Sequence, residues 1–388
     1  MTEVGDVFRQ FGTQYRKDHR LPIRMLKVMK AIESCRTAAL GGHVDECEAC
    51  GHMDISYNSC RNRHCPKCQG AAKEKWIQER NKDLLPVPYY HVVFTIPSEL
   101  NDIALRNQRE IYNILFRAVS ETLTTLGKDP KYLGAEIGFI SILHTWGQNL
   151  MDHPHIHCIV PSGGVSVQTG KWITGNNKFF IPVKVLSRMF RGKFLFYLKK
   201  AYKNEELKFH GNIAHIHKRE VFQELVDKLY SKEWVVYSKI PFGGPKQVIE
   251  YLGRYTHKVA ISNERIERIS DRGVTFKWRD YRDKNNKKKM TLDGSEFIRR
   301  FLLHVLPEGF MKIRHYGLLS NRNRKTKLKE CKEELQMQSN DIQVIEERQD
   351  ELSVEGTGTN IKICSKCKRG QMHPKETIGP IRHNIPYP

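Results

Sequence analysis

The chain has 388 residues, enough for two or three domains, and 39% of them are hydrophobic, as in globular proteins. Lys and Arg exceed Asp and Glu by 65 to 43, and the formal charge of +22 favours nucleic acid as the partner over an uncommitted basic surface or an anionic membrane. The sequence contains no run of about 18 apolar residues and no apolar signal core, which predicts a cytoplasmic protein without a membrane span. Disulfides are rare in the cytoplasm.

The N-terminal part is expected to be helical on both sides of a cysteine-rich segment. Apolar residues between Leu21 and Ile32 recur at helical spacing, which predicts a helix over residues 18–40. A second helix is predicted over residues 71–86, since its sequence ends at a proline.

Two Cys-x2-Cys pairs lie between these helices, with 14 residues between the pairs. Each pair places two thiolates within reach of one tetrahedral ion, and cysteines buried only for packing have no reason to keep this spacing. The sequence therefore predicts one four-cysteine zinc ribbon, formed by Cys47, Cys50, Cys65 and Cys68.

Other cysteines and histidines leave the number of zinc sites open. Four of them could complete a second zinc site, replace a primary ligand or bind nothing: Cys35, His43, Cys60 and His64. Near the C-terminus lies half of a further site, Cys364 and Cys367, which would need His373 or a distant residue.

Basic residues beside the second cysteine pair predict contact with DNA: Arg61, Arg63 and Lys67. We expect these residues to bind the end of the DNA element. Two further basic stretches, residues 284–289 and 322–329, are expected to follow the phosphate backbone.

The middle of the chain alternates predicted strands and helices. A strand rich in aromatic and β-branched residues is expected over residues 89–97, and an amphipathic helix over 102–126. Two further strands, 135–147 and 155–167, have a separation that suits a hairpin. Residues 181–231 look mostly helical, and residues 233–241 predict another strand.

The predicted hairpin contains the sequence His-Ile-His. Alternate side chains of a strand share a face, so His155 and His157 point the same way and can bind one divalent ion; a pair of exposed or core-satisfied histidines is the alternative. Gln148, across the turn, is the expected third ligand, which would leave positions open for phosphate and water. Three other histidines are alternatives: His144, His153 and His91.

Residues 243–261 predict a turn that enters a helix, in which Tyr251 and Tyr255 are four apart and share a face. An aromatic core stripe is the alternative, but polar residues surround the pair: Arg254, His257 and Lys258. We expect Arg254 and Lys258 to bind DNA. A glycine within a helix, such as Gly253, lowers stability by about 1 kcal/mol relative to alanine, but it lets another backbone approach closely. A tyrosine hydroxyl is a weak nucleophile that a metal on the scissile phosphate can make adequate.

The C-terminal third begins with a predicted strand over residues 273–281, a basic turn after it, and a helix over 295–307. The apolar pattern fades from about residue 321, which predicts a polar tail. The expected division is a helical zinc-binding module for DNA recognition (1–82), a catalytic domain (85–265), its extension (266–320), and a basic, partly disordered tail (321–388).

Taken together, these motifs resemble the HUH-type two-tyrosine transposases of bacterial insertion sequences, the insertion-sequence-91 group. The similarity spans about residues 15–335 and rests on three segments: His155-Ile156-His157, Tyr251-Leu252-Gly253-Arg254-Tyr255, and the cysteine-rich module. The segment 304–324 is similar as well.

The resemblance implies an α+β fold, an HUH endonuclease domain whose central antiparallel sheet is flanked by helices, preceded by the small zinc ribbon. It implies catalytic Mg²⁺ or Mn²⁺ besides structural Zn²⁺, and single-stranded DNA at element ends, often near hairpins, as substrate along with target DNA. Rolling-circle transposition would then proceed through a 5′-phosphotyrosine intermediate. Gln148 as a metal ligand follows related HUH nucleases by analogy, and His257 is its rival.

Three other functions are weighed against a transposase. A plasmid replication initiator or relaxase-type nickase would use the same site at a plasmid origin, and the zinc module and the sequence after residue 300 speak for the transposase. A non-catalytic zinc-ribbon DNA-binding protein would leave both motifs unexplained. A zinc hydrolase that uses His155 and His157 would give the tyrosines no task.

Overall fold

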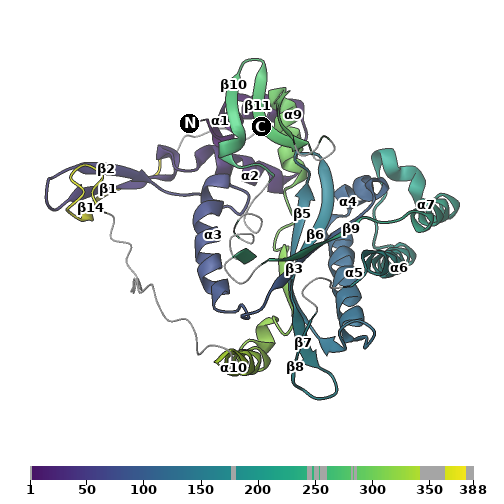
Figure 1. Cartoon of the computed structure of the whole chain (residues 1–388). Helices are drawn as coiled ribbons and strands as arrows, with labels where there is room; N and C mark the ends of the chain where they lie inside the picture. Colours follow the sequence, from purple (N-terminus) through teal and green to yellow (C-terminus); the bar gives the residue numbers. More distant parts are fainter. Residues whose placement is uncertain are drawn as a thin grey trace.

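The computed structural model describes residues 2–175, 181–242, 247–248, 253, 260–280, 283, 286–340 and 363–381. Its fold is a mixed α/β arrangement built on antiparallel sheets. A five-stranded sheet lies at the centre, and a long three-stranded arm projects from one side (Figure 1).

The chain begins with two helices, α1 (Val4–Asp18) and α2 (Ile23–Ser34). The helix predicted over residues 18–40 is therefore too long at both ends, and α1 was not expected. A capping box between Glu3 and Asp6 begins α1. The next helix, α3 (Pro66–Asn81), begins at the second cysteine pair with a proline in its first turn, where the missing N–H costs nothing.

The central sheet has the order β13-β5-β6-β3-β9, and each neighbouring pair is antiparallel. Its strands are β3 (Tyr89–Thr95), β5 (Gly138–Trp146), β6 (Asp152–Pro161), β9 (Val236–Phe242) and β13 (Ile313–Gly317). The strands predicted over 89–97 and 233–241 are thus confirmed as β3 and β9. Those predicted over 135–147 and 155–167 are confirmed in part as β5 and β6, because their outer ends belong to short strands of another sheet, at 135–136 and 163–166. The edge strand β13 was not expected.

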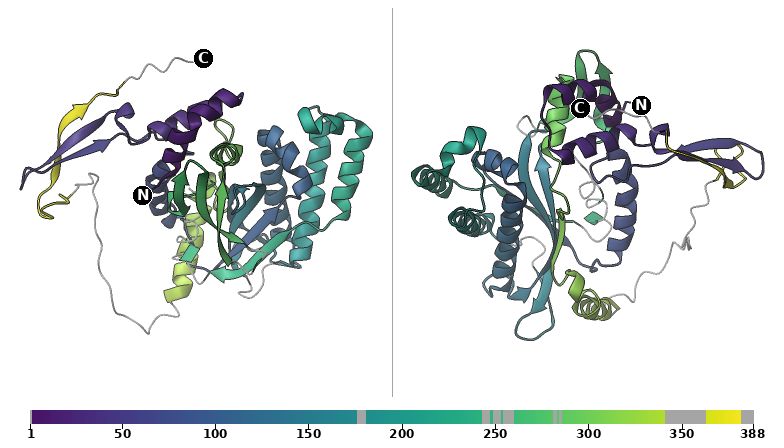
Figure 2. Two further views of the ribbon diagram at one scale, coloured as in Figure 1. Left: turned by 90° about the horizontal axis from the view of Figure 1, so that it is seen from above. Right: turned by 180° about the vertical axis from the view of Figure 1, so that it is seen from behind.

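One face of this sheet is covered by helices, as the views from above and behind show (Figure 2). These helices are α4 (Asn101–Arg106), α5 (Gln108–Lys128), α6 (Val183–Lys203) and α7 (Arg219–Ser231). The largest hydrophobic core lies between them and inward side chains such as Phe94, Ile156 and Cys158. The helix predicted over 102–126 is confirmed, although Asn107 divides it.

A second core joins segments far apart in the sequence. It contains Val7, Phe8 and Met29 from α1 and α2, and Phe276 and Phe301 from the C-terminal half. The latter belong to the sheet β10 (Ile266–Ser270), β11 (Gly273–Asp280) and β12 (Asn286–Leu292), and to α9 (Gly294–Leu303). The segments predicted as an N-terminal module and as a distant extension therefore share one hydrophobic core.

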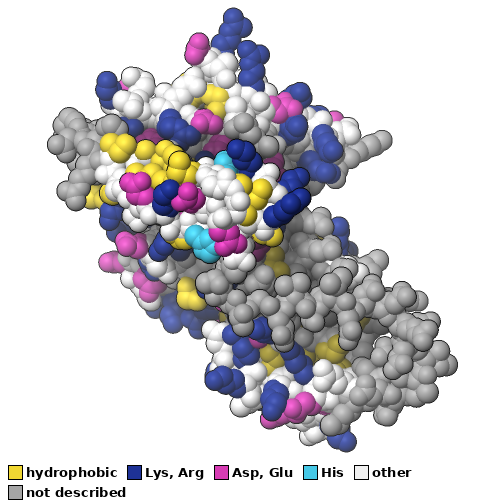
Figure 3. All heavy atoms as spheres, turned by 90° about the vertical axis from the view of Figure 1, so that its left-hand side faces the viewer, with side chains coloured by type: hydrophobic (Ala, Val, Ile, Leu, Met, Phe, Trp, Pro, Cys, Tyr) yellow, Lys and Arg dark blue, Asp and Glu magenta, His cyan; other side chains and the backbone are white. Residues whose placement is uncertain are grey.

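The remaining elements lie at the periphery. A small sheet contains β4 (Ala135–Glu136), β7 (Gly163–Ser166) and β8 (Trp172–Thr174), and α10 (Lys327–Asn340) packs near it. The projecting arm consists of β1 (Gly42–Cys47), β2 (Met53–Tyr57) and β14 (Met372–Ile378). Lys and Arg side chains are spread over the arm side of the molecule among fewer acidic ones (Figure 3).

One prediction for the C-terminal third is wrong in part, and two elements of the tail were not predicted. The basic stretch after residue 282 was expected to be a turn, but from residue 286 it forms β12, paired with β11 from end to end. The polar tail contains α10, and its last part contains β14. The strand over 273–281 and the helix over 295–307 are confirmed as β11 and α9.

Candidate metal centres

Three histidines of the central sheet converge on one point. His155 and His157 lie on β6, and His144 lies directly opposite His155 on β5. Each of the three offers one ring nitrogen, and these nitrogens all lie within 4.8 Å of one another. The predicted shared face of His155 and His157 is therefore confirmed, and the sheet register adds His144 as the third imidazole.

Hydrogen bonds orient two of these rings. His155 Nδ1 lies 2.6 Å from the carbonyl oxygen of His153, which can only accept, so Nδ1 carries the proton and Nε2 holds the lone pair. His157 Nδ1 lies 2.8 Å from Nε2 of His91 on β3. If His157 donates in that pair, its Nε2 is also a ligand nitrogen, an arrangement typical of metal-binding histidines.

Burial keeps the rings of His155 and His157 neutral. His144 and His157 are 4% and 8% exposed. Burial, and then the neighbouring histidines, hold the pKa of His157 well below its usual range, and burial lowers the pKa of His155 to about 4. The pKa of His91 falls to about 3 for the same reason. Neutral imidazole is the form that binds a metal, so His155 and His157 can act as ligands at pH 7.

Gln148 lies in the turn of the β5–β6 hairpin, beyond the last ladder pair of Trp146 and Asp152. Its carbonyl oxygen accepts a hydrogen bond of 2.6 Å from Arg265. Its role as a metal ligand stays a prediction, whereas His144, named only as an alternative from the sequence, is already in place. Strand alternation could not reveal His144, because its position depends on the register between two strands.

The predicted tyrosines, Tyr251 and Tyr255, lie outside the described residues, as do Arg254, His257 and Lys258. Two described residues, Val248 and Gly253, lie on either side of Tyr251 in the sequence. Val248 is fully buried in the cluster that contains Ile142 and Ile159, which share the sheet face of the histidines. A Cβ atom on Gly253 would lie 2.7 Å from Ile77 and 3.0 Å from Lys73, so Gly253 contacts α3 closely.

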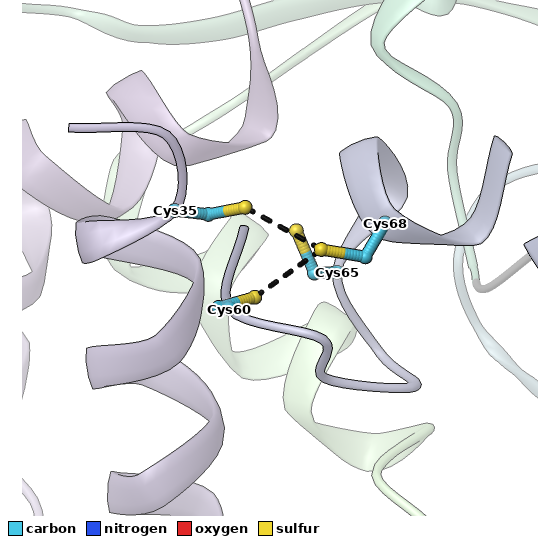
Figure 4. A group of neighbouring side chains, drawn as sticks. All are labelled: Cys35, Cys60, Cys65 and Cys68. Carbon is cyan, nitrogen blue, oxygen red and sulfur yellow. Dashed lines mark hydrogen bonds between the residues drawn. The ribbon is translucent and has the colours of Figure 1, made fainter. Parts of the chain in front are cut away.

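The first cysteine cluster joins α2 to α3. It contains Cys35 at the end of α2, Cys60, and the pair Cys65 and Cys68 at the beginning of α3, with all four sulfurs within 4.8 Å (Figure 4). The Cys35 and Cys60 sulfurs lie 3.5 and 3.6 Å from that of Cys68. Four thiolates at such distances are the donor set of a structural zinc site.

The second cysteine cluster lies in the arm and contains Cys47, Cys50, Cys364 and Cys367. Backbone amides of Gly370 and Arg369 lower the pKa of Cys367 to about 6, which favours the thiolate that a metal binds. The half-site predicted near the C-terminus is therefore completed by a distant pair, and His373 instead contacts Glu48 at 2.9 Å.

The predicted zinc ribbon of Cys47, Cys50, Cys65 and Cys68 is accordingly wrong, because the structure divides these residues between two clusters. Cys35 and Cys60, which looked surplus, belong to the first cluster. The two histidines have other contacts: His43 lies 3.5 Å from Asp45, and His64 accepts a hydrogen bond from the Leu306 amide. Cysteine spacing identified the pairs but not their partners.

Two of the three basic residues predicted to contact DNA are engaged within the protein. Arg63 donates a 2.7 Å hydrogen bond to the carbonyl of Phe310, and burial lowers its pKa. Lys67 forms an ion pair of 2.5 Å with Glu3. These contacts dock the first cluster onto the rest of the protein. Arg61 is exposed and stays a prediction for DNA contact.

Comparison with known proteins decides the family. Residues 138–327 match the family model described as putative transposase, and residues 7–96 match the transposase zinc-binding domain. The chain is 50% identical over 374 residues to the putative transposase y4qJ of Sinorhizobium fredii, covering 95% of this chain and 94% of that protein.

A second relative is the transposase for insertion sequence element IS801 of Pseudomonas savastanoi pv. phaseolicola, 29% identical over 74% of this chain and 68% of its own length. The chain belongs to the insertion-sequence-91 family of transposases. No solved structure matches it. The zinc-binding domain and the two cysteine clusters together support structural zinc in this transposase. None of the helices in its described parts has the length and apolar character of a membrane span.

Proposed function

We propose that this transposase cleaves and rejoins single-stranded DNA at the ends of its insertion sequence, with Tyr251 or Tyr255 as the nucleophile. The observation that carries the proposal is the cluster of three imidazoles on the central sheet, on the face whose core includes Val248. Both the histidines and the two tyrosines lie within the range matched by the transposase model. An HUH-type endonuclease fold is part of the same proposal.

His144, His155 and His157 would hold the catalytic ion. When bound, a divalent ion polarises the scissile phosphate and stabilises the charge that develops on it. Within the described residues no carboxylate joins these imidazoles, and imidazole ligands are more typical of transition-metal ions than of Mg²⁺. We therefore expect Mn²⁺ to support more activity than Mg²⁺.

The tyrosine oxygen forms a bond to phosphorus as the bond to the 3′ oxygen breaks. The products are a 5′-phosphotyrosine and a free 3′-hydroxyl, and the phosphodiester energy is kept in the covalent adduct. A later attack by a 3′-hydroxyl on that adduct joins the strands and releases the tyrosine. Two tyrosines allow two such transfers in succession, as rolling-circle transposition requires.

The test is covalent capture. Labelled single-stranded oligonucleotides from both flanks of the gene are incubated with Mn²⁺ or Mg²⁺ and with wild-type protein, Tyr251→Phe, Tyr255→Phe and the double variant. Tyr230→Phe, an exposed tyrosine on α7, is the matched control. A metal-dependent adduct that persists in the control and disappears in the double variant supports the proposal. An adduct that survives the double variant would exclude these nucleophiles.

The alternatives predict different results. A replication initiator or relaxase-type nickase would form the adduct on a plasmid origin and not on the element ends. A non-catalytic zinc-ribbon protein would bind DNA equally well after loss of the histidines or tyrosines and would form no adduct on any substrate. Family membership favours the transposase over both.

A further inference from the structure

Segments from the N-terminal and C-terminal parts of the chain meet in the arm. Strand β14 pairs with β1 over six residue pairs, from Gly42 opposite Ile378 to Cys47 opposite Met372 (Figure 1). The Glu48 amide also donates a hydrogen bond of 3.1 Å to the Gln371 carbonyl. This ladder brings the C-terminal Cys-x2-Cys pair beside the N-terminal one.

The sulfur positions fit a zinc ion and not a disulfide. The sulfurs of Cys47 and Cys367 are 3.7 Å apart, and those of Cys50 and Cys364 are also 3.7 Å apart. A tetrahedral site with Zn–S bonds of about 2.3 Å separates its sulfurs by about 3.8 Å, whereas a disulfide needs about 2.05 Å. A Cβ atom on Gly370 would lie 2.5 Å from the Cys47 sulfur, so the missing side chain makes room for the cluster.

We propose that this arm cluster binds a zinc ion of its own, which fastens residues 363–381 to the N-terminal module. The match to the zinc-binding family model ends at residue 96, so Cys364 and Cys367 lie far outside it. The chain then holds two structural zinc ions, one of which has ligands from both the N-terminal module and residues 363–381. This proposal is independent of the tyrosine chemistry.

Metal content tests it directly. Purified wild-type protein should contain two zinc ions per chain, and Cys364→Ser/Cys367→Ser should contain one. Cys331→Ser removes a buried cysteine outside both clusters and should keep two. Gly370→Val, which fills the space beside Cys47, should also lose one ion while all ten cysteines remain. One ion in the wild type, or two in the double variant, would overturn the proposal.

A different observation concerns the edge of the central sheet. A groove of about 810 Å³ runs along β13, between α3 and α5. Its lining contains no Asp or Glu. It combines arginines with aromatic side chains and includes Trp76, Arg80, Arg109, Asn113, Phe310, Arg314, Tyr316 and Arg324. Pockets of this volume accept ligands of the size of one or two nucleotides.

Its arginines keep a net positive charge. Arg80 and Arg324 share Asp83 at 3.0 and 3.1 Å, and Arg80 also lies 3.7 Å from the exposed Glu79, so four arginines face two carboxylates. Arg109 and Arg314 donate instead to neutral acceptors, the Glu308 carbonyl and the Asn113 side chain, each at 2.6 Å. Within the described parts of the chain no ion pair involves Arg109 or Arg314, so both are positioned but not neutralised.

Aromatic rings complete the chemistry that single strands need. The rings that bases could reach are those of Trp76 and Tyr316, which are half-buried in the lining. The buried rings of Phe116 and Phe310 instead hold the Arg314 guanidinium at the groove, at 4.1 and 5.3 Å from their centroids. Proteins that bind single-stranded nucleic acid combine basic residues along the backbone with aromatic platforms for the bases. A duplex, whose bases are stacked within it, cannot use such platforms.

The groove also lies beside the histidine cluster. Ile313 in its wall is opposite Ile142, two residues before His144 on the next strand. Two residues along a strand and one strand across amount to about 8 Å. Helix α3 joins the two places, because Trp76 and Arg80 line the groove while Lys73 and Ile77 contact Gly253.

We infer that the groove holds a segment of single-stranded DNA next to the scissile phosphate, an inference that rests on the proposed function. Binding is measured without added Mg²⁺ or Mn²⁺, by anisotropy of a labelled single-stranded oligonucleotide across NaCl concentrations. Arg109→Ala/Arg314→Ala should reduce the slope of log K against log[salt] by about 1.4, or 0.7 for each phosphate contact. Arg188→Ala, an exposed arginine of α6, is the control.

An unchanged slope and affinity in the double variant would overturn the groove, and so would equal loss of affinity for a duplex of the same sequence. The covalent capture assay separates the two proposals. Should the tyrosines form no adduct while the arginine variant still loses single-strand affinity, the groove stands and the proposed chemistry fails. If the tyrosines form an adduct but the arginine variant keeps the wild-type salt slope, the proposed chemistry stands and the groove fails.

Discussion

Asp152 should make the stability of this protein depend on pH. It begins β6, the strand of the histidines, and its carboxyl group is buried with neither oxygen hydrogen-bonded among the described residues. Burial, and then the nearby Asp102, raise the pKa of Asp152 from its ordinary 3.8 to about 7. The folded protein therefore binds this proton more tightly than the unfolded chain does.

The sign follows from that difference. The proton stabilises the fold fully below about pH 4, and this contribution is lost as pH rises through about 7, at about 1.4 kcal/mol per pH unit. The pKa difference of about three pH units between the folded and unfolded states corresponds to about 4 kcal/mol of unfolding free energy. This value is an upper limit, because the carboxyl group is not wholly enclosed. Asp152→Asn, which cannot ionise, should thus gain about 2–4 kcal/mol over the wild type at pH 8.

Urea unfolding of both proteins at pH 5 and pH 8 measures the effect. The difference in unfolding free energy between variant and wild type should be larger at pH 8 by roughly 2 kcal/mol. Asp102→Asn, which leaves Asp152 able to ionise, should show a smaller dependence of the same sign. A difference that is the same at both pH values would refute the reasoning, because it would mean that Asp152 does not change its charge between them.

Three further predictions concern the metal centres and the fold. His144→Ala should weaken Mn²⁺ binding in titration calorimetry by more than about tenfold, whereas Gln148→Ala should change it less; the reverse order would exclude His144 as the third ligand. Gly317→Ala should lower the unfolding free energy by more than about 2 kcal/mol, because Gly317 has a φ of +55° and the new Cβ would lie 1.9 Å from the Ile137 carbonyl oxygen. Gly309→Ala is the control, since Gly309 has a φ of +68° but open space around it. This variant should lose only about 1 kcal/mol in the same denaturation assay. Cys60→Ser should lower zinc content by one ion and also lower the melting temperature, since the first cluster joins α2 to α3; an unchanged melting temperature would mean that it carries no structural load.

The sequence predicts local features of this fold well and distant pairings poorly. Four strands of the central sheet could be predicted because they are rich in β-branched and aromatic residues. The edge strand β13 has only five residues and mixed polarity, so nothing local distinguishes it. Strand β14 was missed because it forms only against β1, more than three hundred residues earlier.

The candidate sites show the same limit. Alternation along β6 placed His155 and His157 on one face, but His144 joins them only through the register of β5 against β6. The Cys-x2-Cys spacing identifies a pair of ligands because two thiolates on one tight turn reach one ion. It carries no information on which second pair completes the tetrahedron, and proximity in sequence suggested the wrong partner for Cys47 and Cys50.

Helix α3 connects the structural metal to the proposed chemistry. Its first turn contains Cys65 and Cys68, and about 14 Å further along, at 1.5 Å per residue, Ile77 contacts Gly253 between the two predicted nucleophiles. The same helix presents Arg80 to the groove at β13. A zinc ion at the first cluster would therefore fix the position of α3, and through it Gly253 and the groove relative to the histidines. Structural zinc can thus be essential for cleavage without contacting DNA.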